Sequence, residues 1–225
     1  MIYMENVKKI YHTGKVDFEA LKNITLTIEQ GEYLSIVGPS GSGKSTMMNI
    51  IGCLDTPTSG IYNLEGRSVE KMTSNQLADV RNKKIGFVFQ AFNLLPYATA
   101  FENIEVPLLF AKTPGKKRKE RVLELLSRVG LADKINNKPT EMSGGEMQRV
   151  AIARSLANDP DIILADEPTG NLDSKSGGEI VKIFDELNEA GKTVVIITHD
   201  MNLAAKTERI IKIKDGLIEN NGYHK

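Results

Sequence analysis

The sequence has 225 residues, enough for one domain with a full hydrophobic core or for one domain with a subdomain. Its 29 basic and 29 acidic side chains give a formal net charge of zero, which argues against a dedicated nucleic-acid-binding protein. The single cysteine, Cys53, excludes an internal disulfide. Because we find neither a signal-peptide pattern nor a run of ~20 apolar residues, we expect a soluble, cytoplasmic chain without a direct membrane span.

The first part of the chain predicts strands that lead into a glycine-rich loop. Residues 2–7 and 20–28 are short β-like runs bounded by turn residues, which predicts an antiparallel sheet. Residues 33–37 (YLSIV) are apolar and partly β-branched, as expected of a buried strand. Residues 60–70 predict a hairpin that adds to the antiparallel sheet.

The glycine-rich loop, residues 38–46 (GPSGSGKST), fits the phosphate-loop pattern G-x-x-x-x-G-K-[ST] between a strand and a segment of helical periodicity. Glycines allow successive backbone N–H groups to turn inward around a phosphate, and the helix N-terminus adds the positive end of its dipole. We expect Lys44 to reach the β- and γ-phosphates and the Ser45 hydroxyl to bind Mg²⁺. The loop therefore predicts nucleoside triphosphate binding by Gly38, Pro39, Ser40, Gly41, Ser42, Gly43, Lys44, Ser45 and Thr46.

The middle of the chain predicts a mainly helical segment after one more strand. Residues 75–84 predict a short helix, and residues 85–90 (IGFVFQ) predict a buried strand. Residues 101–134 predict helix, with breaks at Pro107 and at residues 113–115. We expect the last helix to bury one apolar face, formed by Val122, Leu125, Leu126 and Val129. Gly130 is expected to cap its C-terminal end.

From residue 143 onward the pattern alternates between helices and strands. A helix from residue 143 precedes strands at residues 162–165, 193–198 and 210–214, which are separated by two helices, the first of them over residues 178–190. Such alternation argues for a parallel sheet that is covered on both faces. The predicted fold class is therefore α/β.

The strand at residues 162–165 is followed directly by two carboxylates, Asp166 and Glu167. Open α/β sheets place their ligand chemistry at the carboxyl ends of strands. We expect Asp166 to hold Mg²⁺, directly or through a water, and Glu167 to polarise an attacking water. A surface turn would be the simpler explanation if the phosphate loop were absent.

Residues 141–149 (EMSGGEMQR) predict an unusual helix start. Ser143 can cap the helix, and Glu146 completes a capping box of the form S-x-x-E. Gly144 and Gly145 leave their backbone N–H groups approachable, which makes a second anion site at a helix N-terminus. A plain helix cap remains the alternative for this segment taken alone.

Several motifs occur in a fixed order along the chain. They are GPSGSGKST, a strand-terminal Gln90, MSGGE followed by MQRVAIARSL, ILADEP, Asn171-Leu-Asp173, and His199 after a strand. Over nearly its whole length the chain resembles the ATPase subunit of an ATP-binding-cassette (ABC) transporter. NIIGCLDTPTSG and ILADEPTGNLDSKSG look like the MacB/LolD-type branch, in which a separate permease carries the membrane segments.

The resemblance implies a P-loop NTPase fold: a RecA-like core with a mostly parallel sheet, an N-terminal antiparallel β subdomain and a helical signature subdomain. These would form one nucleotide-binding domain over residues 1–225, with the helical subdomain at about residues 91–155. It also implies an ATP-dependent, head-to-tail homodimer. Each ATP would lie between the phosphate loop of one copy and the partner's signature segment, Ser143, Gly144, Gly145 and Glu146.

The resemblance assigns roles to the remaining residues. Mg²⁺ would be bound by Ser45, Gln90 and Asp166, and Glu167 would be the general base, its water held with the help of His199. Tyr11 would stack on the adenine, with His12 and Phe18 as rivals, and Asp173 would lie at the dimer interface. The predicted catalytic residues are Glu167, His199, Gln90 and Lys44.

Two segments depart from the family pattern, and a third is a candidate contact surface. The signature reads MSGGE where the family usually has LSGGQ, and because Glu146 adds a negative charge near an anion site we expect slightly weaker ATP-driven dimerisation. The sequence Gly170-Asn171 replaces Ser-Ala of the common form, which leaves the roles of both residues open. Residues 92–107 would meet the permease's cytoplasmic coupling helix, or form a buried helical core, and the contact residues would be Leu94, Leu95 and Tyr97.

The sequence thus predicts an ATP-binding and ATP-hydrolysing subunit that powers a separate integral-membrane permease of the MacB/FtsX kind, in export or lipoprotein release. It would lie on the inner face of the cell membrane through that permease. An FtsE-like alternative drives a permease-like partner without moving a solute. A soluble ATPase acting on ribosomes or DNA is disfavoured, because the chain has neither two cassettes nor a long coiled coil.

Overall fold

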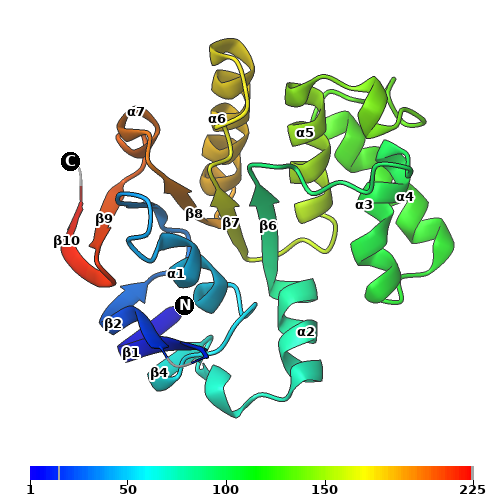
Figure 1. The fold of residues 1–225 in the computed structure, drawn as a ribbon. Coiled ribbons are helices and arrows are strands. Elements are labelled where there is room, and N and C mark those ends of the chain that lie inside the picture. Colours follow the sequence, from blue (N-terminus) through cyan, green and yellow to red (C-terminus); the bar gives the residue numbers. More distant parts are fainter. Residues whose placement is uncertain (15, 224–225) are drawn as a thin grey trace. The chain divides into compact units, whose positions relative to one another are not determined.

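The computed structural model describes residues 1–14 and 16–223 (Figure 1). The chain divides into two compact units. Unit 1 comprises Met1–Arg81 and Thr193–Lys225, and unit 2 comprises Asn82–Lys192. The predicted α/β class is confirmed, since parallel strands, an antiparallel sheet and helices are all present.

Unit 1 contains the predicted antiparallel sheet, in which the strand order is β2-β1-β4-β5. Its buried Tyr62 hydroxyl donates to the carbonyl of Ile51 at 2.6 Å, which ties the sheet to helix α1 (Lys44–Ile51). Cys53 packs beside Tyr62 and is only 1% exposed, and burial raises the pKa of its thiol to about 11. The strands are β1 (Ile2–Thr13), β2 (Val16–Ile28), β4 (Ser59–Leu64) and β5 (Arg67–Ser68).

The second group of strands in unit 1 positions the glycine-rich loop, in the order β10-β9-β3-β8. Strand β3 runs parallel to both β8 and β9. All residues of β3 and β8 are buried, which explains why both read as continuous apolar runs. The elements are β3 (Tyr33–Val37), α1 (Lys44–Ile51), β8 (Thr193–Thr198), α7 (Met201–Ala204), β9 (Arg209–Lys214) and β10 (Leu217–Tyr223).

Strand β10 was not predicted, although its turn carries a sequence signal. Asp215 and Gly216 join β9 to β10 with φ angles of 50° and 78°, and Asp-Gly is a preferred pair for such a tight hairpin. The Gly216 N–H donates to the carbonyl of Ser42 at 2.9 Å, and the Lys22 N–H donates to the carbonyl of Gly216 at 2.8 Å. The hairpin turn thus supports the glycine-rich loop from one side.

Unit 2 combines two parallel strands with four α-helices and one 3-10 helix. Residue pairs run from Ile85 with Ile162 to Phe89 with Asp166 along the two strands. The predicted apolar face of α4 is buried, and Gly130 follows it with φ 70°, as expected of a C-terminal cap. The elements are β6 (Ile85–Phe89), α3 (Ala100–Phe110), α4 (Gly115–Arg128), η2 (Pro139–Glu141), α5 (Gly144–Ser155), β7 (Ile162–Asp166) and α6 (Ser174–Glu189); η1 (Val69–Lys71) and α2 (Ser74–Lys84) precede them.

Two predicted helix boundaries in unit 2 were wrong. Helix α3 continues through Pro107, because the Ala111 N–H still donates to the Pro107 carbonyl at 3.0 Å and buried side chains before and after the proline hold the helix in place. Burial therefore outweighs the one hydrogen bond that proline removes. Helix α6 begins at Ser174, four residues before the predicted start, because Asp173 caps it.

Candidate functional site

The glycine-rich loop follows β3 and opens α1. Gly43 adopts φ 106° and accepts the first helical hydrogen bond, from the Met47 N–H at 2.8 Å. The Lys44 ammonium donates to the carbonyls of Gly38 at 2.7 Å and Pro39 at 2.9 Å, which keeps the side chain over the loop. Among the described residues, the buried Ser42 hydroxyl has no hydrogen-bond partner. Leaving a buried hydroxyl unpaired costs free energy of folding, and this hydroxyl could donate a hydrogen bond to a phosphate oxygen.

The phosphate loop and His199 leave neighbouring strands. Val37 and Thr198 are paired residues of β3 and β8, so Gly38 and His199 both emerge at the same carboxyl edge. A cavity of about 690 Å³ is lined by His199 together with Gly38 and Pro39. Unit 1 therefore brings His199 to the first residues of the loop.

Tyr11 lies in β1 and is half-buried beside the phosphate loop. Its hydroxyl donates to Asp55 at 3.0 Å, and the Lys9 ammonium lies 5.0 Å from the ring centroid. Burial raises the pKa of Tyr11, with Asp55 adding to the shift and a hydrogen bond with Thr46 opposing it. The rival Phe18 is paired with Tyr11 across β1 and β2, so the two aromatic side chains share one face of the sheet.

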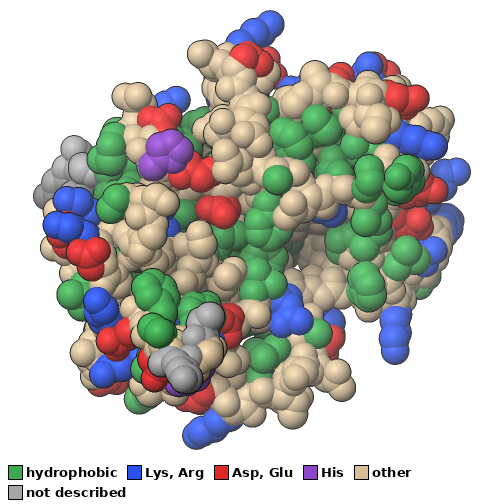
Figure 2. All heavy atoms as spheres, in the orientation of Figure 1, with side chains coloured by type: hydrophobic (Ala, Val, Ile, Leu, Met, Phe, Trp, Pro, Cys, Tyr) green, Lys and Arg blue, Asp and Glu red, His purple; other side chains and the backbone are tan. Residues whose placement is uncertain are grey.

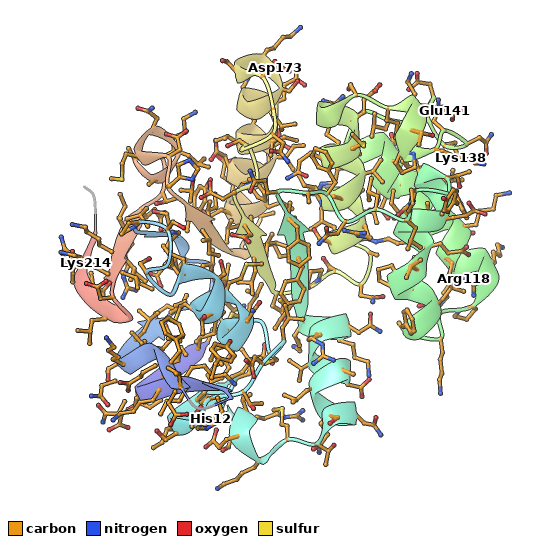
Figure 3. The ribbon with its side chains drawn as sticks, viewed as in Figure 1. His12, Arg118, Lys138, Glu141, Asp173 and Lys214 are labelled. Atoms are coloured by element: carbon orange, nitrogen blue, oxygen red, sulfur yellow. The ribbon has the colours of Figure 1, made fainter. Side chains whose placement is uncertain are left out.

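The other rival, His12, is exposed and pairs with Asp17, its Nδ1 lying 2.6 Å from the carboxylate (Figure 3). This contact occupies one of the two ring nitrogens. The partly buried Tyr11 offers the better-fixed ring of the three aromatic candidates.

In unit 2, Gln90 and the pair Asp166–Glu167 also emerge from neighbouring strands. Phe89 and Asp166 are paired residues of β6 and β7, so Gln90 and Glu167 follow side by side. Glu167 adopts φ 44°, an uncommon backbone conformation for a residue with a side chain. The Gly170 N–H donates to the Glu167 carbonyl at 3.0 Å, and the fully buried Gln148 amide donates to the carbonyl of Pro168 at 2.7 Å. These bonds hold Glu167 in a strained turn, as is common at functional sites.

The predicted capping box at the start of α5 is present. The Glu146 N–H donates to Ser143 Oγ at 3.3 Å, and the Ser143 N–H donates to Glu146 Oε2 at 2.8 Å. The Ser143 N–H lowers the pKa of Glu146, and Lys134 contributes in the same direction, so the carboxylate is charged at neutral pH. A Cβ on the buried Gly145 would lie 2.9 Å from Ser176 Oγ, so this glycine also allows α5 to pack closely on α6.

Asp173 stands at the start of α6 (Figure 3). Its Oδ1 accepts from the N–H groups of Lys175 and Ser176, both at 3.0 Å, and Ser176 Oγ donates to its Oδ2 at 2.7 Å. The Ser176 N–H is the main cause of a lowered Asp173 pKa. Asp173 is thus an exposed, charged helix cap.

The comparison with known families decides the identity of the chain. Residues 21–170 match the sequence profile described as "ABC transporter", which is more than half of the chain. The chain belongs to the ABC transporter family. It is an ABC-type ATPase.

Relatives extend this match along nearly the full cassette. An uncharacterised ABC transporter ATP-binding protein of Thermotoga maritima is 54% identical over 95% of this chain and 92% of its own length. The macrolide export ATP-binding/permease protein MacB of Rhodopseudomonas palustris is 48% identical over 96% of this chain, which spans only 33% of MacB. The dimeric, post-hydrolysis structure of the cassette MJ0796 of Methanocaldococcus jannaschii, bound to ADP and Pi, is 50% identical, with a TM-score of 0.92 over 100% of this chain and 99% of that one. The predicted resemblance is therefore confirmed.

The ABC cassette also contains contacts that sequence reasoning missed. Asn171 hydrogen-bonds to both the main chain and the side chain of Gln90. Arg154, on α5, donates to the carbonyls of Phe92 and Asn93 in the loop after Gln90. The departure at Gly170-Asn171 was the only sequence signal for the first contact, and an arginine within a helix gives no signal for the second.

The predicted Mg²⁺ ligands suit the ion chemically. A serine hydroxyl, an amide oxygen and a carboxylate are hard oxygen donors, and Mg²⁺ in nucleotide sites usually takes few protein ligands. Ser45 lies in unit 1, whereas Gln90 and Asp166 lie in unit 2. Within residues 1–14 and 16–223, no three His, Cys, Asp or Glu side chains form a metal-binding group, and no helix is both long and apolar enough to span a bilayer.

Proposed function

We propose that this ABC ATPase powers a separate integral-membrane permease in a MacB-like system that exports a substrate or releases lipoproteins. The observation that carries the proposal is the 48% identity to MacB, a protein named for macrolide export, over 96% of this chain. The Thermotoga relative, covered over 92% of its length, is named as an ATP-binding protein alone. This supports a separate permease subunit, through which the chain would be held at the cytoplasmic face of the membrane.

We propose further that two copies bind two ATP molecules between them. The phosphate loop of one copy would hold each triphosphate, and the partner's Ser143, Gly144 and Gly145 would complete the enclosure. The capping box supports this arrangement, because it fixes the helix start whose N–H groups would face the γ-phosphate. The dimeric structure of MJ0796 bound to ADP and Pi supports it as well.

In hydrolysis, Glu167 would accept a proton from the attacking water, and His199 would contact the γ-phosphate and help hold that water. Lys44 and the backbone N–H groups of the loop would stabilise the negative charge that develops on the phosphoryl oxygens. Mg²⁺, held by Ser45, Gln90 and Asp166, would supply further charge neutralisation when bound. Tyr11 would stack on the adenine, and Asp173 would lie at the dimer interface.

We place the permease contact on the loop that follows Gln90. The fully buried Asn103 accepts from the Leu95 N–H at 2.7 Å and donates to the carbonyls of Leu95, Ala98 and Thr99, so the loop is held in one conformation. Leu95 and Tyr97 are 51% and 88% exposed. Hydrophobic side chains lie among charged ones on the molecular face shown in Figure 2. A fixed, exposed apolar surface suits a protein partner.

Affinity purification from detergent-solubilised membranes tests the proposed function. We expect a permease of the MacB or FtsX kind to co-purify, and ATP-dependent transport in vesicles that contain both proteins. Tyr97→Ala should reduce co-purification without changing ATP binding. If the pair hydrolyses ATP but moves no solute, the FtsE-like mechanical function replaces transport. If no membrane protein co-purifies, the proposal is wrong.

Glu146 provides a prediction about the dimer. Its charged carboxylate lies beside the proposed γ-phosphate site, so Glu146→Gln should strengthen ATP-dependent dimerisation and raise the ATPase rate by roughly two- to fivefold, as expected for removing one partly screened charge. Glu102→Gln is the matched control, because Thr99 and Glu102 form the same kind of capping box on α3. Equal dimerisation constants for wild type and Glu146→Gln, by analytical ultracentrifugation, would disprove the effect.

A further inference from the structure

Gln90 is held by a reciprocal pair of hydrogen bonds to Asn171. Asn171 Nδ2 donates to the main-chain carbonyl of Gln90 at 2.9 Å, and Gln90 Nε2 donates to Asn171 Oδ1 at 3.2 Å. The two residues are 81 positions apart in the sequence, and both belong to unit 2. The turn that carries Asn171 also carries the interface candidate Asp173.

Donor and acceptor chemistry fixes the orientation of both amides. A main-chain carbonyl only accepts hydrogen bonds, so Asn171 must present its NH₂ group to Gln90 O. Its oxygen then faces the Gln90 side chain and requires a donor, which only the Gln90 NH₂ group can supply. The Gln90 Oε1 atom is consequently turned to the opposite side of its amide from Asn171.

Gly170 makes room for this arrangement. A Cβ at position 170 would lie 2.7 Å from Gln90 Nε2 and 3.2 Å from Gln90 Cδ. Gly170 does not need a positive φ, so alanine can adopt its backbone conformation. An added methyl group would therefore displace the flexible amide of Gln90 without unfolding the turn.

We propose that Asn171 and Gly170 are positioning residues that set the orientation of the Gln90 amide, so that Oε1, and not Nε2, is presented to the divalent cation. This inference rests on the proposed role of Gln90 in binding Mg²⁺. It gives a physical reason for the Gly-Asn pair at positions 170 and 171. It also makes the conformation of the 170–173 turn a determinant of cation affinity.

The test measures cation binding separately from turnover. The melting temperature is measured at a fixed concentration of AMP-PNP, a non-hydrolysable ATP analogue, while Mn²⁺ is titrated. The Mn²⁺ concentration that gives half of the maximal rise in melting temperature reports the affinity of the cation site. We expect Asn171→Ala and Gly170→Ala to raise it roughly tenfold, as typical of residues that orient a metal ligand. Nucleotide binding in EDTA and the melting temperature of the free protein should stay unchanged. Asn136→Ala, at an exposed asparagine after α4, is the control and should match wild type.

Further variants make the result decisive. Asn171→Asp keeps the shape but replaces the donor that faces Gln90 O with an acceptor, so it should fail like alanine; rescue by Asp would overturn the orientation argument. In a Gln90→Ala background, Asn171→Ala should add nothing, and an undiminished effect there would overturn the inference. If Gln90→Ala itself matches wild type in Mn²⁺ binding, the metal role of Gln90 and this inference both fail. Failure of the proposed role of Glu167 as the general base is seen separately, as unchanged hydrolysis in Glu167→Gln.

Discussion

Glu167→Gln is expected to reduce ATP hydrolysis by roughly 10²- to 10⁴-fold, the range typical for loss of a general base. Gln has the same shape, so it can retain the strained backbone of φ 44° and the bond from Gly170. The variant should therefore still bind ATP and accumulate as an ATP-bound dimer. Steady-state phosphate release and size-exclusion chromatography with ATP and Mg²⁺ measure the two effects.

The matched control is Glu179→Gln, an acidic residue on α6 whose ion pair with Arg149 lies on the protein surface. It should keep the wild-type hydrolysis rate within about twofold, because exposed ion pairs contribute little. Hydrolysis by Glu167→Gln at the wild-type rate would exclude Glu167 as the base. A variant that is inactive but stays monomeric with saturating ATP, even beside its membrane partner, would contradict the proposed shared site.

The second large effect is expected for Gly38→Ala, through stability of the phosphate loop. An added Cβ would lie 2.1 Å from the carbonyl oxygen of Ile213 in β9 and 2.7 Å from Ser42 Oγ. The Ile213 carbonyl belongs to the main chain of β9, so it cannot move away from the added methyl group without disturbing the sheet. We therefore expect a loss of about 2–4 kcal/mol in the free energy of unfolding. ATP binding should fall at the same time, because the loop must move away from β9. Urea denaturation and isothermal titration calorimetry give the two quantities.

Gly178→Ala provides the same chemical change at a permissive position. Gly178 lies within α6, and no atom lies within 4 Å of the Cβ that alanine would add. Alanine favours the helix over glycine, so this variant should be more stable by about 0.5–1 kcal/mol and bind ATP normally. If Gly38→Ala were as stable as wild type, the tight contact with β9 would not constrain the loop.

The parts of the molecule that sequence reasoning predicted well are those specified by neighbouring residues. The phosphate loop follows from nine consecutive residues, and the burial of β3 and β8 from their apolar runs. The α4 face and its glycine cap follow from helical spacing. Motif order was also enough to predict the family, because the spacing of the motifs is itself specific.

The parts that were missed depend on residues far apart in the chain. The continuation of α3 through Pro107 depends on packing that a local helix rule does not include. The bond between Asn171 and Gln90 joins two loops that only the paired strands β6 and β7 bring together. The β9–β10 hairpin had a local Asp-Gly signal, and it was missed because the last residues lack the strong apolar pattern of the other strands.

The burial of Cys53 has a practical consequence for following the two copies in solution. With a thiol pKa of about 11 and 1% exposure, its reactive thiolate is scarce near neutral pH. A cysteine introduced at an exposed site such as Tyr97 should therefore take up a maleimide spin label or fluorophore selectively, without removal of the native one. Distances between two such probes would then show whether the proposed dimer opens and closes during each round of nucleotide turnover.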